Sequence, residues 1–156
     1  MSGLVQRVRA KVDGRCIATR IRKQGCGVSL DGAPAPRMIV DFDRPESPLG
    51  PSDQRCDYLF VADAADRDGW VAPLELKRGR FHAREFVRQL QAGATAAEKL
   101  VPRSAEVRFR PIAVVGGGMT KEEWNKSRQK RNAVRFRGKY ELLRSLTSGQ
   151  KLADQL

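Results

Sequence analysis

The chain has 156 residues, the size of one ordinary domain, and 40% of them are hydrophobic, which is enough for a packed core and excludes a disordered chain. Its 30 Lys and Arg residues against 18 Asp and Glu give a formal net charge of +12, which indicates a polyanionic partner, most often nucleic acid. The sequence lacks an apolar run near the roughly 18 residues of a membrane span, and its N-terminus lacks the apolar middle of a signal peptide, so we expect no membrane association.

The three cysteines are Cys16, Cys26 and Cys56. An odd number without C-x-x-C spacing favours reduced thiols over disulfides or structural zinc. We therefore expect a cytoplasmic protein, associated with the nucleoid if the source is bacterial. A basic protein with no nucleic-acid role is the alternative to a nucleic-acid-binding one.

The first third of the chain carries the weaker structural signals. Residues 4–12 alternate apolar and basic side chains too loosely to assign, and residues 15–30 fit a hairpin whose turn is loosened by glycines. Residues 37–43 predict a strand, and the proline-rich residues 44–55 predict a surface loop.

The middle of the chain gives stronger signals. Residues 56–62 and 70–77 predict two strands joined by a polar turn, with Pro73 marking a bulge or a locally unpaired position. Residues 81–101 have helical periodicity that Pro102 ends. The pattern within this helix rests on five apolar residues: Phe86, Leu90, Ala94, Ala97 and Val101.

The last third begins with a strand over residues 106–118 that ends in three glycines. Thr120 and Glu123 have the spacing of a capping box at the start of a helix. Residues 139–146 form an element of uncertain type, and residues 147–156 are expected to be a flexible tail. The order strand, strand, strand, helix, strand predicts one α/β or α+β domain over residues 1–146.

The acidic residues are concentrated in one segment. Nine of them lie between Asp41 and Glu75, opposed by three arginines, so this segment carries −6 and the rest of the chain +18. A basic surround suits phosphates, and an acidic centre suits a divalent cation. The Asp41-x-Asp43 pair within it is nearly uninformative as a motif, because a strand entering a turn has the same pattern.

Strand geometry brings three of the charged residues together. Side chains at i and i+2 share a face of a strand, so Glu75 and Lys77 project together while Leu74 and Leu76 face the core. If residues 56–62 and 70–77 pair as a hairpin, Asp57 lies beside Glu75 and Lys77. Two adjacent carboxylates repel unless a cation lies between them, and Mg²⁺ prefers such oxygen ligands.

Asp57, followed after a hairpin by Glu75-Leu76-Lys77, an amphipathic helix and a further strand, resembles the PD-(D/E)xK nuclease superfamily, which has the restriction-endonuclease-like fold. The resemblance covers roughly residues 37–118 and implies a mixed sheet with flanking helices and an αβββαβ core. It implies Mg²⁺, or Mn²⁺ in its place, held by Asp57, Glu75 and the Leu76 carbonyl, with Lys77 beside the attacking water.

Other features of the family find only partial counterparts. Cys56 stands where the family has proline. Glu46 is the candidate for the acid that members supply from the first helix, and Gln89 or Gln91 is the candidate for the helical glutamine. No tyrosine follows at the spacing of the Q-x-x-x-Y signature. His82, Glu85 and Gln89 share one helical face, and a lone surface histidine is the simplest interpretation of His82.

A basic segment over residues 121–139 is the candidate phosphate-binding region. Residues 133–137 alternate and fit an edge strand with its arginines facing outward. Trp124 and Phe136 either stack on bases or anchor the segment. The basic residues of this segment are Lys121, Lys126, Arg128, Lys130, Arg131, Arg135, Arg137 and Lys139.

These patterns predict a Mg²⁺-dependent nuclease that hydrolyses the phosphodiester bonds of nucleic acid, with DNA favoured. The alternative is a catalytically inactive nucleic-acid-binding module of the same fold. A homodimer or a protein partner stays open, and so do substrate strandedness and sequence specificity.

Overall fold

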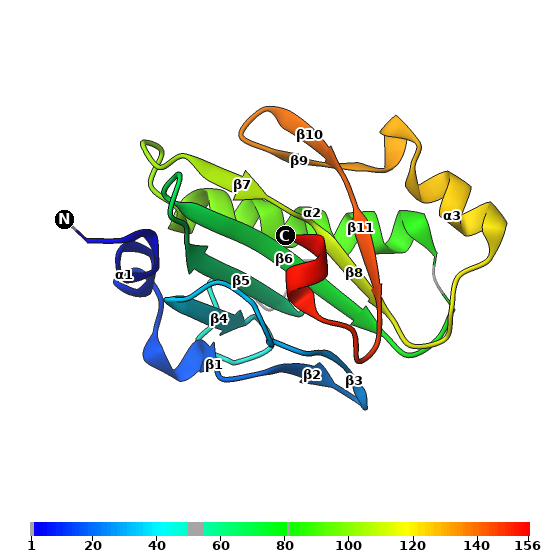
Figure 1. Cartoon of the computed structure of the whole chain (residues 1–156), viewed down its shortest axis with the longest axis horizontal. Helices are drawn as coiled ribbons and strands as arrows, with labels where there is room; N and C mark the ends of the chain where they lie inside the picture. The colour runs from blue at the N-terminus through cyan, green and yellow to red at the C-terminus, as the bar shows by residue number, and fades with distance from the viewer. Residues whose placement is uncertain (1, 50–54, 81) are drawn as a thin grey trace.

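A computed structural model describes residues 2–49, 55–80 and 82–156 (Figure 1). Its centre is a mixed sheet in the order β1-β4-β5-β6-β8-β11, with β7 also paired to β6. The strands of this sheet are β1 Ile17–Ala18, β4 Arg37–Asp41, β5 Tyr58–Asp63, β6 Gly69–Lys77, β7 Val107–Phe109, β8 Ile112–Val115 and β11 Arg144–Thr147. The architecture is therefore α+β with a mixed sheet, which confirms the fold class at this level.

The sheet is antiparallel from β1 to β6 and parallel from β6 to β11. The change of direction follows from the connections, because β5 and β6 are joined by a short turn whereas β6 and β8 need a crossover. Helix α2, Ala83–Leu100, supplies that crossover. The strand expected over 106–118 is split at Arg110 and Pro111 into β7 and β8.

Pro73 lies at that split. Strand β6 pairs with β7 up to Val71 and with β8 from Leu74, so Pro73 has no partner on this side. On the other side β5 and β6 pair without a bulge, Leu59 opposite Pro73. Proline lacks a backbone N–H, and at this position the sheet needs no hydrogen-bond donor. Of the two predictions for Pro73, a bulge or a locally unpaired position, the structure shows the second.

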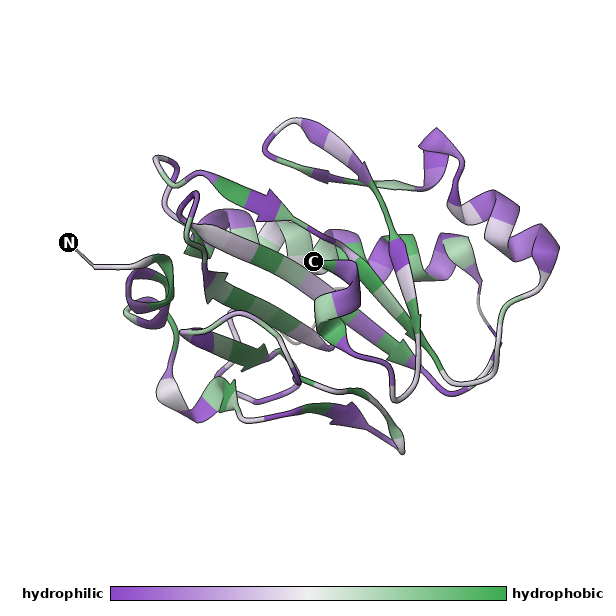
Figure 2. Cartoon of the chain, viewed as in Figure 1, coloured by the Kyte–Doolittle hydropathy of each residue, from purple (hydrophilic) through white to green (hydrophobic). Residues whose placement is uncertain are grey.

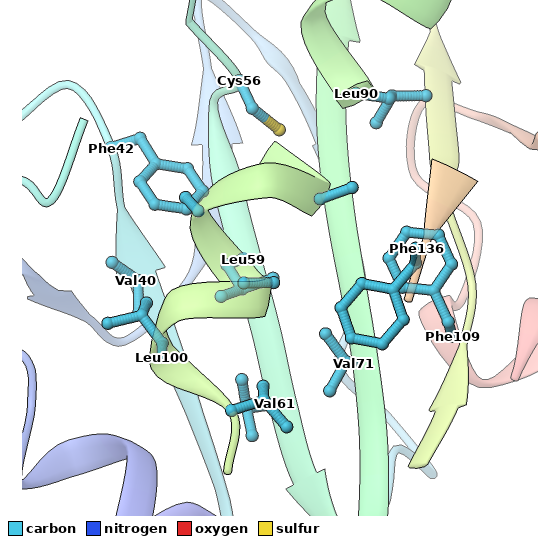
Figure 3. Close-up of a cluster of buried hydrophobic side chains, with 14 of the residues drawn as sticks. Val40, Phe42, Cys56, Leu59, Val61, Val71, Leu90, Leu100, Phe109 and Phe136 are labelled. Atoms are coloured by element: carbon cyan, nitrogen blue, oxygen red, sulfur yellow. The ribbon is translucent and has the colours of Figure 1, made fainter. Parts of the chain in front are cut away.

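One face of the sheet is covered by α2 and by the short helix α1, Leu4–Arg9. Figure 3 shows part of the hydrophobic core on this face of the sheet. Phe86 and Leu90 are fully buried at the spacing the sequence predicted. The rings of Phe109 and Phe136 stack with centroids 4.4 Å apart and bring the C-terminal third of the chain onto this core.

The opposite face is covered by a hairpin of β2, Ile21–Lys23, and β3, Cys26–Val28, and by the 3₁₀ helix η3, Leu152–Gln155. In Figure 1, α2 lies behind the sheet and η3 in front of it. Residues 147–156 were expected to be a flexible tail. Instead Leu152 is fully buried and its N–H donates to the Ser29 carbonyl at 2.9 Å, because the apolar end of the chain closes this second core.

The C-terminal third packs against α2. Helix α3 is Lys121–Ser127, and β9, Ala133–Phe136, forms a hairpin with β10, Lys139–Leu142. Two smaller 3₁₀ turns are η1, Gly14–Cys16, and η2, Lys130–Asn132. Figure 2 shows α3 mainly in hydrophilic colours, whereas the central strands are largely hydrophobic.

The expected capping box at α3 is only half formed. Thr120 Oγ1 accepts a hydrogen bond from the Glu123 N–H at 3.1 Å, as predicted. The Glu123 side chain does not return to Thr120; it accepts from the N–H of Ala83 at 3.0 Å and so caps α2. Tertiary packing therefore places the Glu123 carboxylate at the N-terminus of α2, where a negative charge is favourable.

Two further expectations concern element bounds and the membrane. The predicted helix 81–101 begins at Ala83, residue 81 itself lying outside the described residues, and part of the predicted loop, 50–54, also lies outside them. Among the described residues, no helix combines the length and apolar character that crossing a membrane requires.

Candidate metal and phosphate site

The carboxyl groups of Asp57 and Glu75 lie together at the end of the β5–β6 pair. Tyr58 is opposite Leu74, which places Asp57 opposite Glu75 one step further along. The Asp57 N–H donates to Glu75 Oε1 at 3.1 Å, and the Leu76 N–H donates to Asp57 Oδ2 at 2.8 Å. The backbone thus holds both carboxyl groups in place, and the adjacency expected from strand register is present.

Glu75 is only 4% exposed. Burial, followed by the nearby charge of Asp57 and a side-chain hydrogen bond with it, raises the pKa of Glu75 to about 9. Lys77 opposes this rise but does not cancel it. The protein without a metal therefore holds Glu75 protonated near neutral pH, which is the expected response of two adjacent carboxyl groups with no cation between them.

Lys77 is the next charged group on this edge. Its Nζ lies 2.6 Å from Glu85 Oε1 and 5.9 Å from the centroid of the Phe86 ring. Both partners belong to the first turn of α2, so the helix positions the ammonium group beside the carboxyl pair. The ion pair also lowers the pKa of Glu85, through the hydrogen bond from Lys77.

The structure adds a second lysine that the sequence did not single out. Lys23 Nζ, from the end of β2, lies 3.5 Å from Asp57 Oδ1 and 3.4 Å from Asp41 Oδ1, and it also bonds Asp43. Burial disfavours its charge, but the hydrogen bond to Asp43 and the charges of Asp57 and Asp41 outweigh burial and raise the pKa of Lys23. Lys23 also lies 4.7 Å above the Tyr58 ring.

Asp41 and Asp43 therefore belong to the same edge of the sheet as Asp57. Asp41 is 8% exposed and also accepts from Arg44 Nε at 3.1 Å and from the Asp43 N–H at 3.0 Å. Asp43 faces the cavity beside Asp57. The D-x-D spacing was the only available sequence signal, and it became meaningful only because the sheet and the β2–β3 hairpin converge here.

A cavity of about 400 Å³ opens beside these groups. It is lined by Lys23, Gln24, Asp43, Asp57, Glu75, Leu76, Lys77, Arg78 and Gly79. No group of three or more His, Cys, Asp or Glu side chains within residues 2–49, 55–80 and 82–156 is arranged to hold a metal ion alone. Two carboxylates, a main-chain carbonyl and waters suffice for Mg²⁺, so the donors at this cavity fit that ion.

Glu46 does not join these residues. Its carboxylate pairs with Arg15 Nη1 at 3.4 Å, and it is absent from the lining of the cavity beside Asp57. The prediction of Glu46 as a metal ligand is therefore wrong for this arrangement. The loop after β4 carries Glu46 toward the N-terminal segment, a direction that its place in the sequence could not reveal.

The two glutamines of α2 have different surroundings. Gln91 bonds both backbone groups of Arg135, at 2.9 Å to the carbonyl and 2.8 Å from the N–H, so it holds β9 against the helix. Gln89 lies one turn after Glu85, the partner of Lys77, and its Oε1 is buried without a hydrogen-bond partner among the described residues. Of the two candidates for the helical glutamine of the predicted site, only Gln89 has a side-chain oxygen without a hydrogen-bond partner among the described residues.

A basic groove separates the start of α2 from α3. This cavity of about 680 Å³ is lined by His82, Ala83, Arg84, Val87, Arg88, Glu123, Lys126, Arg131 and Asn132. Lys126 and Arg131 were predicted to contact phosphate, and Arg84 and Arg88 were missed because they lie outside the basic segment. Glu123 is the only acid among the described residues of this lining, and its carboxylate is already engaged with the Ala83 N–H and Lys126.

Arg137 differs from the other predicted phosphate ligands. Its guanidinium donates to the carbonyls of Ala105 at 2.6 Å, Pro102 at 2.5 Å and Val101 at 3.3 Å. It therefore holds the turn that follows α2, from the C-cap residue Val101 onward, and lies near the helix C-terminus, where a cation is favourable. Its prediction as a nucleic-acid contact is replaced by a structural role.

The remaining basic residues of segment 121–139 mostly keep exposed side chains. Arg128 lies 5.5 Å from the Trp124 ring, and Trp124 is 45% exposed. Phe136, by contrast, is buried against Phe109, which selects its anchoring role over base stacking. The exposed basic positions are Lys121, Arg128, Lys130, Arg131, Arg135 and Lys139.

Comparison with known proteins adds no relative. No protein-family model matches the chain, and no curated protein or solved structure is significantly similar to it. The fold and the residues of the Asp57–Glu75 edge therefore carry the functional argument by themselves. They define an α+β protein with a pair of carboxyl groups of which Glu75 is buried, two flanking lysines and a neighbouring basic groove.

Proposed function

We propose that the protein is a Mg²⁺-dependent nuclease with a PD-(D/E)xK-type site, acting on nucleic acid, with DNA as the favoured substrate. The observation that carries the proposal is the hydrogen-bonded pair of Asp57 and Glu75, with Lys77 two residues further along the same strand. The proposed arrangement is restriction-endonuclease-like, in which a helix follows the catalytic hairpin and leads to a parallel strand.

The element order supports this proposal. Helix α1, strands β4, β5 and β6, helix α2 and strand β8 follow the αβββαβ order, with β1 to β3 inserted after α1 and the short β7 before β8. Strands β4 to β6 are antiparallel, and β8 is parallel to β6. This topology puts the end of β6 and the start of α2 at one edge, where the charged residues collect.

The chemistry of the carboxyl pair supports a metal. Asp57, Glu75 and the Leu76 carbonyl would hold Mg²⁺, which when bound supplies a lowered pKa of water and stabilises charge that develops on phosphate oxygens. The raised pKa of Glu75 means that this residue must release its proton to act as a ligand. Asp57 is held by the Leu76 N–H, so its position does not depend on the metal.

The lysines and the groove supply positive charge for the substrate. Lys77, fixed by Glu85, would orient the attacking water and offset phosphate charge. The loop at Gly79 lies against Gly117, where an added Cβ would meet the Gly79 carbonyl at 2.6 Å, so the carboxyl cavity and the loop before α3 adjoin. A nucleic-acid strand that leaves the site would pass this loop toward Arg84, Arg88 and Arg131 in the basic groove.

The direct test is cleavage of labelled DNA and RNA, single- and double-stranded, with Mg²⁺ or Mn²⁺. Asp57→Ala and Lys77→Ala should each abolish detectable product, whereas Asp31→Ala, which removes an exposed acid, should cleave like the wild type. Products carrying 5′-phosphate and 3′-hydroxyl ends are expected, with water attacking the phosphorus and the 3′ oxygen as the leaving group. Cleavage that persists in Asp57→Ala would assign the activity to another site or to a contaminant.

A binding module without catalysis is the second candidate, and Lys23 favours it. Its ammonium group already pairs with Asp43 and Asp57 beside the cavity, as a resident cation in place of a metal. Binding that is salt-dependent but indifferent to Mg²⁺ and to Lys77→Ala, without turnover, would select this candidate.

A further inference from the structure

Arginine side chains gather around Trp70, far from the carboxyl pair. Trp70 and Glu75 are five residues apart on β6, about 16 Å along the strand, and they project from opposite faces of the sheet. Trp70 packs at the border of the core on the β2–β3 side, whereas Glu75 has the strand parity of Val71 in the α2-side core. This region is therefore separate from the site described above.

The backbone of the sheet fixes the arginines in place. Arg108 is the register partner of Trp70 in the parallel β6–β7 pair. Arg110 follows β7, and its N–H donates to the Val71 carbonyl at 2.9 Å. Arg144 opens β11, and its N–H donates at 2.8 Å to the carbonyl of the proline after Arg110.

The guanidinium groups share one aromatic platform. The central carbon of the Arg108 guanidinium lies 5.0 Å from the centroid of the Trp70 ring, and that of Arg110 lies 5.6 Å from it. An aromatic ring at this distance attracts a cation and helps to hold it in place. One N–H group of each guanidinium is already engaged, because Arg108 Nη2 donates to Asp66 and Arg110 Nη1 donates to the Phe109 carbonyl. The two guanidinium groups beside one ring still make a compact cationic surface.

The acids nearby do not balance this charge. Asp66 pairs with Arg108 at 2.7 Å and with Arg67 at 3.8 Å. Arg110 and Arg144 form no ion pair within the described part of the chain, although Glu141 acts on Arg110 from β10. Burial, and then the charge of Arg144, lowers the pKa of Arg110, and its buried Nε lacks a hydrogen-bond partner among the same residues.

We propose that Arg108 and Arg110 beside Trp70, together with the neighbouring Arg144, form a second binding site for the phosphate backbone of nucleic acid, independent of the carboxyl pair; we call these three residues the arginine cluster. Like charges held together destabilise the fold, and an anion bridging them removes that cost. Planar guanidinium forks match phosphate oxygens in bidentate geometry, as they match carboxylates, and the net charge of +12 favours nucleic acid as the polyanion. The site requires neither a metal nor cleavage.

The test is equilibrium binding of fluorescein-labelled single- and double-stranded DNA in EDTA, over a series of salt concentrations. Arg144→Gln should weaken binding by about fivefold to tenfold and reduce the slope of log K against log salt by about one. Arg103→Gln, which removes an exposed arginine of equal charge after α2, is the matched control and should change affinity less than twofold. The unfolding temperature of Arg144→Gln should stay equal or rise, because a repulsive charge is removed.

Tryptophan emission gives a second readout. In a Trp124→Phe background Trp70 is the remaining tryptophan, and unlabelled DNA should change its emission unless Arg108 and Arg110 are replaced by Gln. Equal effects of Arg144→Gln and Arg103→Gln, or Trp70 emission that DNA leaves unchanged, would overturn the proposal. The proposal would also be overturned if Arg144→Gln weakened binding to polyglutamate as much as it weakens binding to DNA, because that result indicates an acidic protein partner. Asp57→Ala should abolish cleavage without altering these signals, so the two proposals fail separately.

Discussion

The backbone N–H of Asp57 donates a hydrogen bond of 3.1 Å to Oε1 of Glu75, across the β5–β6 pair. This bond holds two carboxyl groups together at a sheet edge where one of them is almost fully buried. The cost appears as the raised pKa of Glu75, and it is a cost that a cation or a proton must relieve.

Glu75→Gln should stabilise the metal-free protein at alkaline pH. The folded-state pKa of Glu75, about 9, lies above its unfolded value of 4.5, so the folded state binds the extra proton between these values. Stability is therefore fully present below about pH 4.5, falls as pH rises and reaches its minimum above about pH 9. Glu75→Gln removes this loss. Its free energy of unfolding, measured with urea in EDTA, should exceed that of the wild type by about 1–3 kcal/mol at pH 8 and should differ little at pH 4.

Glu106→Gln, at an exposed position, is the control and should show no such pH-dependent gain. Adding Mg²⁺ should stabilise the wild type and release protons from Glu75, which calorimetry in buffers of different ionisation enthalpy detects. Equal destabilisation of Glu75→Gln at both pH values would show that Glu75 is held as a carboxylate.

Lys23→Met should increase the affinity for Mg²⁺. The Lys23 ammonium lies 3.5 Å from Asp57 Oδ1 and repels a divalent cation at the same carboxylate. Removing it while keeping an apolar side chain over Tyr58 should tighten Mg²⁺ binding by about tenfold in titration calorimetry. Lys11→Met, at an exposed lysine, should leave the affinity unchanged, and weaker Mg²⁺ binding by Lys23→Met would refute competition.

Gly93→Ala should destabilise the protein although alanine favours helices. A Cβ at position 93 would lie 2.8 Å from Cys56 Sγ and 2.9 Å from Pro73 Cβ, at the contact of α2 with β6. We expect a loss of about 1–3 kcal/mol in chemical unfolding, because the helix must move away from the sheet. Thr95→Ala, exposed on the same helix, should be neutral or stabilising, and similar behaviour of both variants would disprove this close packing.

Arg137→Ala should destabilise the fold without a specific loss of nucleic-acid binding. It removes charged hydrogen bonds to the carbonyls of Pro102 and Ala105 in the turn after α2, which we expect to cost about 1–3 kcal/mol in thermal or urea unfolding. Lys130→Ala, at an exposed position near the basic groove, should show the reverse pattern, with unchanged stability and weaker DNA binding. Identical stabilities of the two variants would contradict the structural role of Arg137 and favour a phosphate contact instead.

Sequence alone determined the features that depend on short-range geometry. The two-residue period of β6 placed Glu75 and Lys77 on one face, and the β5–β6 hairpin placed Asp57 beside them. The apolar period of α2 predicted which residues it buries. These patterns are local, since each follows from a single strand, turn or helix and needs no knowledge of distant partners.

Only the tertiary structure decided which distant side chains meet. Lys23 reaches Asp57 because the β2–β3 hairpin folds over the sheet edge, and Glu46 turns away to Arg15. Arg137 binds the turn after α2 instead of facing solvent, and Arg144 comes beside Arg110 because β11 joins the sheet parallel to β8. Loop directions and long-range packing set these contacts, and no spacing within the chain encodes them.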